Sequence, residues 1–197
     1  MPSRKANQIA IAFRNKAIRL DNTRSRVEEA FARGHLRVSD VEVTYAGLFL
    51  QVVVGYEAAV EEFVLGLMVR PGGVESAAAN VRGRLQVRNY AHARQLAAGP
   101  GGRYASWIGK KDVMSVAELV LLNSEPFKSA DWLFVEQCRY VRNAIAHPSD
   151  HAFQQFQRHV VQMRPLPTRE KTVHGFLRGR LSSSSSQTRW ENLAAGL

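Results

Sequence analysis

The sequence contains a single cysteine and no long uninterrupted apolar run. Of its 197 residues only Cys138 carries a thiol, which excludes an intramolecular disulfide and a zinc site built from several cysteines. This usage fits a reducing compartment, and we expect a cytoplasmic protein. The most apolar stretch, residues 45–68, is interrupted by Gln51 and by three glutamates that include Glu57. Because carboxylates are costly inside a bilayer, we expect a buried helix of a soluble protein here and no membrane partner.

Acidic residues are also scarce. The chain has 27 Lys and Arg against 17 Asp and Glu, a net charge of +10. The positive charge collects in residues 1–40, 70–111 and 158–197, whereas the more apolar segments between them are acidic. Basic side chains outside the apolar helices are typical of proteins that bind a polyanion, and we expect RNA as the partner.

Residues 70–111 combine basic and aromatic side chains, the two types that bind single-stranded RNA through phosphate contacts and base stacking. The aromatic candidates are Tyr90, Tyr104 and Trp107. The predicted RNA-binding residues of this segment are Arg82, Arg84, Arg88, Lys110 and Lys111. An alternative interpretation is a loop region without an RNA groove, which contains a short helix around residues 81–96.

The apolar spacing predicts an all-α fold. In residues 39–70 a stripe from Tyr45 to Leu67 repeats every three or four residues, as on one face of a helix. Further helices are expected at residues 21–36, 112–122, 129–146 and 151–163. Gly34 is expected near the end of the first, and Ser149 or Asp150 at the start of the last.

The predicted organisation has three parts. Residues 1–20 form a basic N-terminal arm or helix, residues 21–165 the helical domain with a basic irregular insertion, and residues 166–197 a basic, serine-rich tail. The tail has no clear pattern, and its five serines at 182–186 are expected to be mobile. Residues 188–197 are either a docking peptide or a frayed end.

Three polar residues stand at the expected end of the helix 129–146. Arg142, Asn143 and His147 lie in "RNAIAH", and Pro148 disfavours helical geometry at the histidine. Arginine binds phosphate, imidazole exchanges protons near neutral pH, and an amide can orient either group, so the set suits a phosphodiester transfer. The spacing alone is weak, because about 0.6 matches are expected by chance and Arg169/His174 is a second one.

The stretch "YVRNAIAH" at a helix end resembles the Arg-x4-6-His motif of the HEPN superfamily, and "FLQVVVGYEAAVEEFV" is similar to the earlier core helix of that family. The resemblance covers roughly residues 21–163 and is sharp only at Arg142–His147. It implies an up-and-down helical bundle similar to the stand-alone RiboL-PSP type found in bacterial defence and toxin loci.

The resemblance also implies an activity. HEPN ribonucleases work without a metal or cofactor and dimerise so that two motifs face one cleft. In this chain His147 would move protons at the ribose 2′-OH or the leaving oxygen, Arg142 would stabilise the phosphate, and Asn143 would orient groups around it. Glu57 would hold the arginine. The expected products are a 2′,3′-cyclic phosphate and a 5′-OH, and a toxin of this kind has an antitoxin or regulatory partner.

Other interpretations remain open. His147 can be read as a helix-ending histidine bonded to a carbonyl, and Arg142 as the partner of Glu57 or Glu136. The whole chain can also be read as a non-catalytic HEPN-like module that binds RNA or a partner protein. Ser149 stands where some HEPN toxins carry a modified tyrosine, which argues against silencing by that route. His151 and His159 lack a suitably spaced carboxylate, so no metal site is predicted.

Overall fold

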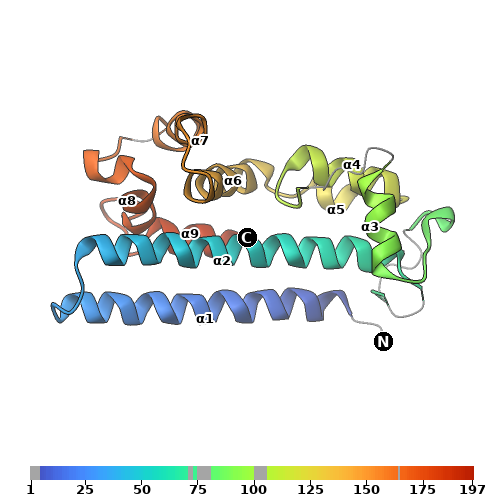
Figure 1. The fold of residues 1–197 in the computed structure, drawn as a ribbon, viewed down its shortest axis with the longest axis horizontal. Coiled ribbons are helices and arrows are strands. Elements are labelled where there is room, and N and C mark those ends of the chain that lie inside the picture. The colour runs from blue at the N-terminus through green and yellow to red at the C-terminus, as the bar shows by residue number, and fades with distance from the viewer. Residues whose placement is uncertain (1–4, 71–72, 75–80, 100–105, 164) are drawn as a thin grey trace. The chain divides into compact units, whose positions relative to one another are not determined.

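A computed structural model of the chain describes residues 5–70, 73–74, 81–99, 106–163 and 165–197. Helices dominate, and the described residues form no β-strand beyond three isolated bridges. The all-α prediction is therefore confirmed at the level of fold class. In chain order the elements are α1 (Ala6–Ala32), α2 (Val38–Met68), η2 (Gly83–Leu85), α3 (Tyr90–Ala98), α4 (Lys110–Val120), α5 (Glu125–Lys128), α6 (Trp132–Ala146), α7 (Asp150–Phe156), η3 (Gln157–Val161), η4 (Thr168–Lys171), α8 (Val173–Arg178) and α9 (Arg189–Gly196) (Figure 1).

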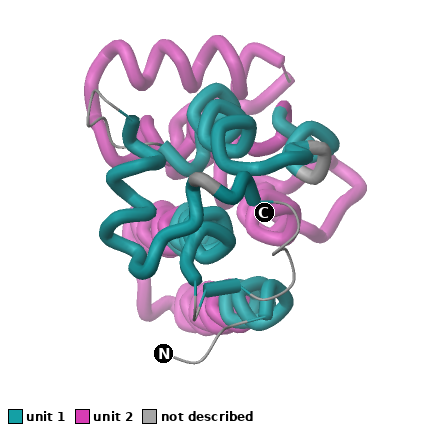
Figure 2. The backbone as a smooth tube through the Cα atoms, turned by 90° about the vertical axis from the view of Figure 1, so that its right-hand side faces the viewer, with its two compact units in different colours: residues 1–14, 55–132 teal, residues 15–54, 133–197 magenta. Residues whose placement is uncertain are grey.

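The chain divides into two compact units (Figure 2). The first unit comprises Met1–Arg14 and Gly55–Trp132, and the second comprises Asn15–Val54 and Leu133–Leu197. Both long helices, α1 and α2, contribute residues to each unit. None of the helices among the described residues is long and apolar enough to cross a membrane.

Glycine ends α1 as its position in the sequence predicts. Gly34 has φ 77°, a left-handed conformation that glycine adopts without a steric cost. Its amide donates to Phe31 O at 2.9 Å, and the amide of His35 donates to Ala30 O at 3.0 Å. These two bonds form a Schellman motif, which turns the chain back toward α2.

The start of α1 differs from the prediction. The helix was expected near Asp21 and begins at Ala6, so it runs through the boundary predicted at residue 20. Ile9 and Leu20 are buried and Phe13 packs edge-on against Tyr56 of α2, with ring centroids 6.1 Å apart. These few apolar contacts keep a basic segment helical, because most helical stability in proteins comes from packing rather than from propensity.

The core of the second unit forms between α2, α6 and the C-terminal helices. On α2 the predicted stripe is buried at Tyr45, Phe49 and Val52. Cys138 and Val141 are fully buried on α6, so the cysteine belongs to the core. In the first unit, α2 continues the core with Leu65 and Met68, and α4 adds Val113, Val116 and Val120.

The C-terminal residues fold as part of the second unit. Residues 173–178 and 189–196 are helices, and Phe176, Leu177 and Trp190 are no more than 1% exposed. Thr188 and Glu191 form a capping box at the start of α9, each bonding the backbone of the other. The sequence has no clear pattern here and leaves open whether these residues fold, and the structure shows that these two stretches form helices. Of the two alternatives for residues 188–197, the docking peptide is confirmed.

Candidate functional site on α6

Helix α6 presents a buried face and a polar face. Trp132, Val135, Cys138 and Val141 are buried, whereas the apolar Phe134 and Ile145 are only half-buried. The polar face consists of residues spaced four, three and four apart, as one side of a helix requires: Glu136, Tyr140, Asn143 and His147. Asn143 and His147 thus lie at the C-terminal end of the polar face, whereas Arg142 lies four residues after Cys138, on the side of the buried face.

The helix ends where the sequence predicts. The amide of His147 donates to Asn143 O at 2.9 Å, and α6 stops at Ala146 because Pro148 follows. The Ser149 hydroxyl then accepts from the amide of Ala152 at 3.3 Å and caps α7. His147 lies between the two helices, and its side chain is exposed.

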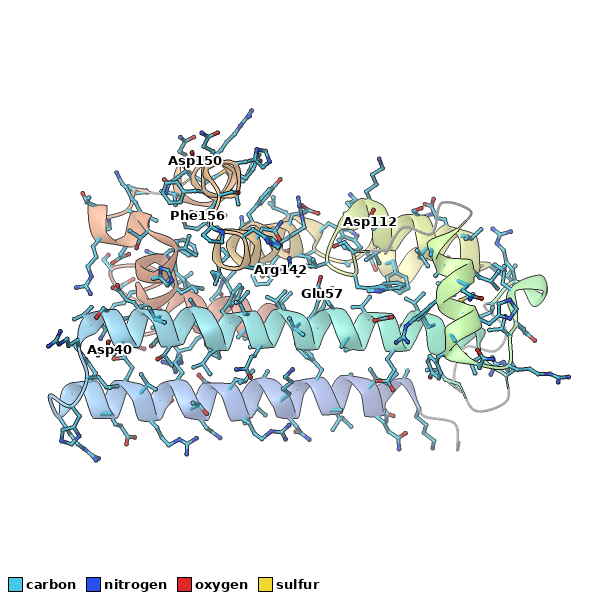
Figure 3. The ribbon with its side chains drawn as sticks, viewed as in Figure 1. Asp40, Glu57, Asp112, Arg142, Asp150 and Phe156 are labelled. Carbon is cyan, nitrogen blue, oxygen red and sulfur yellow. The ribbon has the colours of Figure 1, made fainter. Side chains whose placement is uncertain are left out.

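Arg142 and Asn143 are brought together directly. The Nη1 of Arg142 donates to Asn143 Oδ1 at 3.0 Å, and both side chains are half-buried. The bond fixes one edge of the guanidinium, a group whose fork of donors matches the geometry of a phosphate. Figure 3 shows Arg142 on α6 and Asp150 on α7, the helix that follows the motif. The amide therefore holds the arginine, which is a role that the resemblance implied in general terms.

Two residues that were not predicted for the site flank the motif. The ring of Tyr140 stacks on His159 of η3, with centroids 4.5 Å apart and planes within 10°. The guanidinium of Arg139 lies 4.6 Å from the centroid of the same tyrosine and bonds Glu136 through its Nε at 2.8 Å. Tyr140 precedes Asn143 by three residues, and this spacing alone could have placed the two side chains on one face of the helix. The stack depends on the π-helical turn at residues 157–161, which no sequence pattern indicated.

Glu57 and the motif belong to different units. Glu57 is half-buried on α2 in the first unit, whereas Arg142 lies in the second (Figure 3). The expected contact between Glu57 and the motif arginine stays a prediction. Arg169, from the second match to the motif spacing, bonds Glu42 through both Nε and Nη2, at 3.0 and 2.8 Å. Its role is therefore structural.

The predicted RNA-binding residues lie in the first unit. Arg82, Arg88, Lys110 and Lys111 are exposed, while the side chain of Arg84 lies outside the described residues. The Nη2 of Arg82 approaches Glu118 O at 3.4 Å, a long bond that solvent or a phosphate can replace. These four side chains are accessible to solvent, and RNA binding by them remains a prediction.

The aromatic half of that prediction does not hold for Trp107, which is only 3% exposed and belongs to the core of the first unit. A buried indole cannot stack on a base. Tyr104 lies outside the described residues, and Tyr90 is half-buried at the start of α3. The expected short helix of this region is confirmed at Tyr90–Ala98, where Asn89 Oδ1 accepts from the amide of His92 at 2.9 Å.

No metal-binding cluster of three or more His, Cys, Asp or Glu side chains occurs in the described part of the chain. His159 is engaged with the Tyr140 ring. Comparison with protein-family models, curated proteins and solved structures finds no match to this chain. The resemblance to HEPN proteins therefore depends on the motif residues and on the helix that carries them.

Proposed function

We propose that the protein is a metal-independent endoribonuclease of the HEPN type, a toxin or antiviral effector that works as a homodimer. The observation that supports it is the arrangement at the end of α6: an exposed His147 directly after the last helical residue, and an arginine held by Asn143 within the same two turns. Together they supply a proton-transfer group and a phosphate-binding group on one anchored helix.

The reaction follows from these roles. His147 takes the proton of the ribose 2′-OH, and the 2′ oxygen attacks the neighbouring phosphorus. The bond from phosphorus to the 5′ oxygen breaks, which leaves a 2′,3′-cyclic phosphate on one fragment. The leaving 5′ oxygen takes a proton from the same histidine of a second copy of the chain, which explains why two motifs serve one cleft. Arg142 balances the charge that develops on the phosphate oxygens.

The test is cleavage of labelled bulk tRNA in EDTA by the wild type, His147→Ala and Arg142→Ala. We expect a loss of about 10²- to 10⁴-fold for the histidine and about 10²- to 10³-fold for the arginine, with cyclic-phosphate ends on the wild-type products. Matched controls are His151→Ala and Arg158→Ala, which remove exposed side chains of the same types from α7 and η3. These two variants should cleave as the wild type does.

A second candidate is an RNA-binding module without catalysis, for which the exposed basic residues of the first unit argue. In that case wild type and both motif variants leave the RNA intact and bind it equally. Substitution of Arg82, Arg88, Lys110 or Lys111 would then weaken binding and lower its salt dependence. On a single strand the slope should fall by about 0.7 for each phosphate that the variant no longer neutralises.

A further inference from the structure

A large cavity lies in the second unit, away from the three motif residues. It has a volume of about 1120 Å³ and is lined by α1, α2 and residues 165–191. Sites for small molecules usually measure about 300–1,000 Å³, so the space is sufficient for a nucleotide-sized ligand. Five arginines and four glutamates line the cavity.

Two of the arginines tie the C-terminal segment to the long helices. Arg178 bonds Glu28 of α1 through Nε and Nη2, at 2.9 and 3.0 Å. Arg169 bonds Glu42 of α2 at 2.8 Å. The Arg178–Glu28 pair is bidentate and therefore geometrically specific, and the two pairs together account for two of the four carboxylates.

The other two pairs are more deeply buried. Arg24 bonds Glu191 at 2.6 Å with 9% of its side chain exposed, and Arg189 bonds Glu170 at 2.7 Å with 5% exposed. The Nε of Arg189 has no hydrogen-bond partner among the described residues. A buried donor without a partner is costly, and a ligand or water that accepts from it removes the cost.

One arginine is left over. Each lining glutamate has an arginine partner, and Arg180 has no carboxylate partner in the described part of the chain. Its side chain is exposed. The lining residues therefore carry one net positive charge, and that charge lies at the rim of the cavity.

Three serines follow this arginine within six residues and line the same cavity. Ser182, Ser183 and Ser186 line the cavity from a loop whose ends are held together, since the amide of Leu181 donates to Gln187 O at 2.9 Å. A second bond at 2.9 Å joins the amide of Arg189 to Gly179 O. A guanidinium with adjacent hydroxyl donors is a common way to bind phosphate.

Gly179 allows the loop to start close to the buried pair. A Cβ added there would lie 2.2 Å from Arg189 Nη1 and 2.5 Å from Glu170 Oε2. Since both atoms belong to the ion pair, a side chain at this position would displace it. The loop of serines is thus placed against the buried charges by a residue that has no side chain.

We propose that this cavity binds a small phosphorylated molecule, with its phosphate between Arg180 and the hydroxyls of Ser182 and Ser183. Pro165, Leu166 and Pro167 also line the cavity and offer an apolar surface for the organic body of the ligand. A bound polymer would need an open basic groove along its backbone. Here most of the arginines are already paired, and two are more than nine-tenths buried, which favours a small ligand.

The test uses adenosine 5′-monophosphate as the probe and adenosine as its uncharged counterpart, in titration calorimetry on the full chain. We expect saturable binding of the monophosphate only, and a Kd at least about tenfold higher in Arg180→Gln, since a charge-assisted bond contributes about 1.5–3 kcal/mol. Arg158→Gln, an exposed arginine elsewhere in the second unit, is the control and should not change the Kd.

A second pair of variants tests the proposed phosphate site without changing Arg180. Ser183→Asp should weaken binding, whereas Gln187→Asp adds the same charge in the same loop at a side chain that does not line the cavity and should weaken it much less. All four positions are exposed, so melting curves should match the wild type. The proposal is overturned by the absence of saturable binding of both the monophosphate and inorganic phosphate. It is equally overturned if Arg158→Gln weakens binding as much as Arg180→Gln, or if only an RNA oligonucleotide binds in a manner that depends on Arg180.

Discussion

Residues of α6 that lie one turn apart differ in how far they are buried, as Cys138 and Arg142 show. The cysteine is fully buried one turn before the half-buried Arg142. Burial raises the pKa of the thiol to about 12, because the thiolate would lose its hydration. The thiol is therefore neutral at pH 7, and the thiolate is the reactive form.

We expect Cys138 to resist a thiol reagent in the folded protein. Ellman's reagent at pH 8 should react with less than about a tenth of the thiol within an hour, and with all of it in guanidinium, because reaction then requires opening of the core. The measurement is absorbance with time. Rapid reaction of the native protein would mean that α6 does not pack as the structure shows.

Glu28 makes the stability of the second unit depend on pH. Its hydrogen bond to Arg178 is the main cause that lowers the carboxyl pKa, against an opposing effect of burial. Because the folded pKa lies below the unfolded value of about 4.3, the pair stabilises the fold fully above that value. The contribution is lost as pH falls through the folded pKa.

Glu28→Gln should therefore lower the free energy of unfolding at pH 6 by about 1 kcal/mol and have a smaller effect at pH 2.5. Urea unfolding followed by circular dichroism at the two pH values measures the difference. Glu29→Gln removes the next carboxylate along α1, which is 64% exposed and pairs with Arg33 at 3.7 Å, and should change stability little at either pH. An equal loss at both pH values for Glu28→Gln would contradict the role of charge.

At the scale of elements, α9 depends on one large anchor. Trp190 is 1% exposed, and the buried Arg24 lies 5.6 Å from its ring centroid. Trp190→Ala should cost about 3–5 kcal/mol in urea unfolding and expose residues 165–190 to proteolysis. Leu133→Ala, which trims a side chain that is 69% exposed, is the control and should cost little. Unchanged stability of the tryptophan variant would mean that the C-terminal residues do not dock.

The elements that the sequence predicted well have local signals. A long apolar stripe indicates α2, Gly34 indicates the end of α1, and Pro148 with Ser149 marks the break between α6 and α7. These signals act within a few residues, so they can be recognised without knowing the fold. The end of α6, and with it the setting of the candidate site, was predictable for this reason.

The elements that the sequence missed depend on distant partners. Helices α8 and α9 have six and eight residues, too few to be stable alone, and ion pairs to α1 hold them. The burial of Trp107 and the stack of Tyr140 on His159 likewise need residues that are far apart in sequence or in an unusual turn. Periodicity carries no information about such partners.

At the scale of the whole molecule, the net charge of +10 and the proposed pairing of two motifs affect different steps of the reaction. In the proposed function, charge would attract the RNA, and it acts over a Debye length of about 8 Å at physiological salt. It does not determine how many copies form the cleft. The number of motifs needed per cleavage must therefore be measured by a method that is independent of RNA affinity.

Random mixing of wild type with His147→Ala provides that method. If each cleavage needs the histidine of both copies, only the dimers with two intact motifs are active, and an equal mixture should keep about a quarter of the wild-type activity. If each copy works alone, about half remains. The two proteins are denatured, mixed and refolded together so that the copies assort at random, and tRNA cleavage is measured at constant total protein. His151→Ala mixed in the same way should keep full activity. A value of one half would remove the second motif from the reaction and leave His147 to act with a proton donor from water.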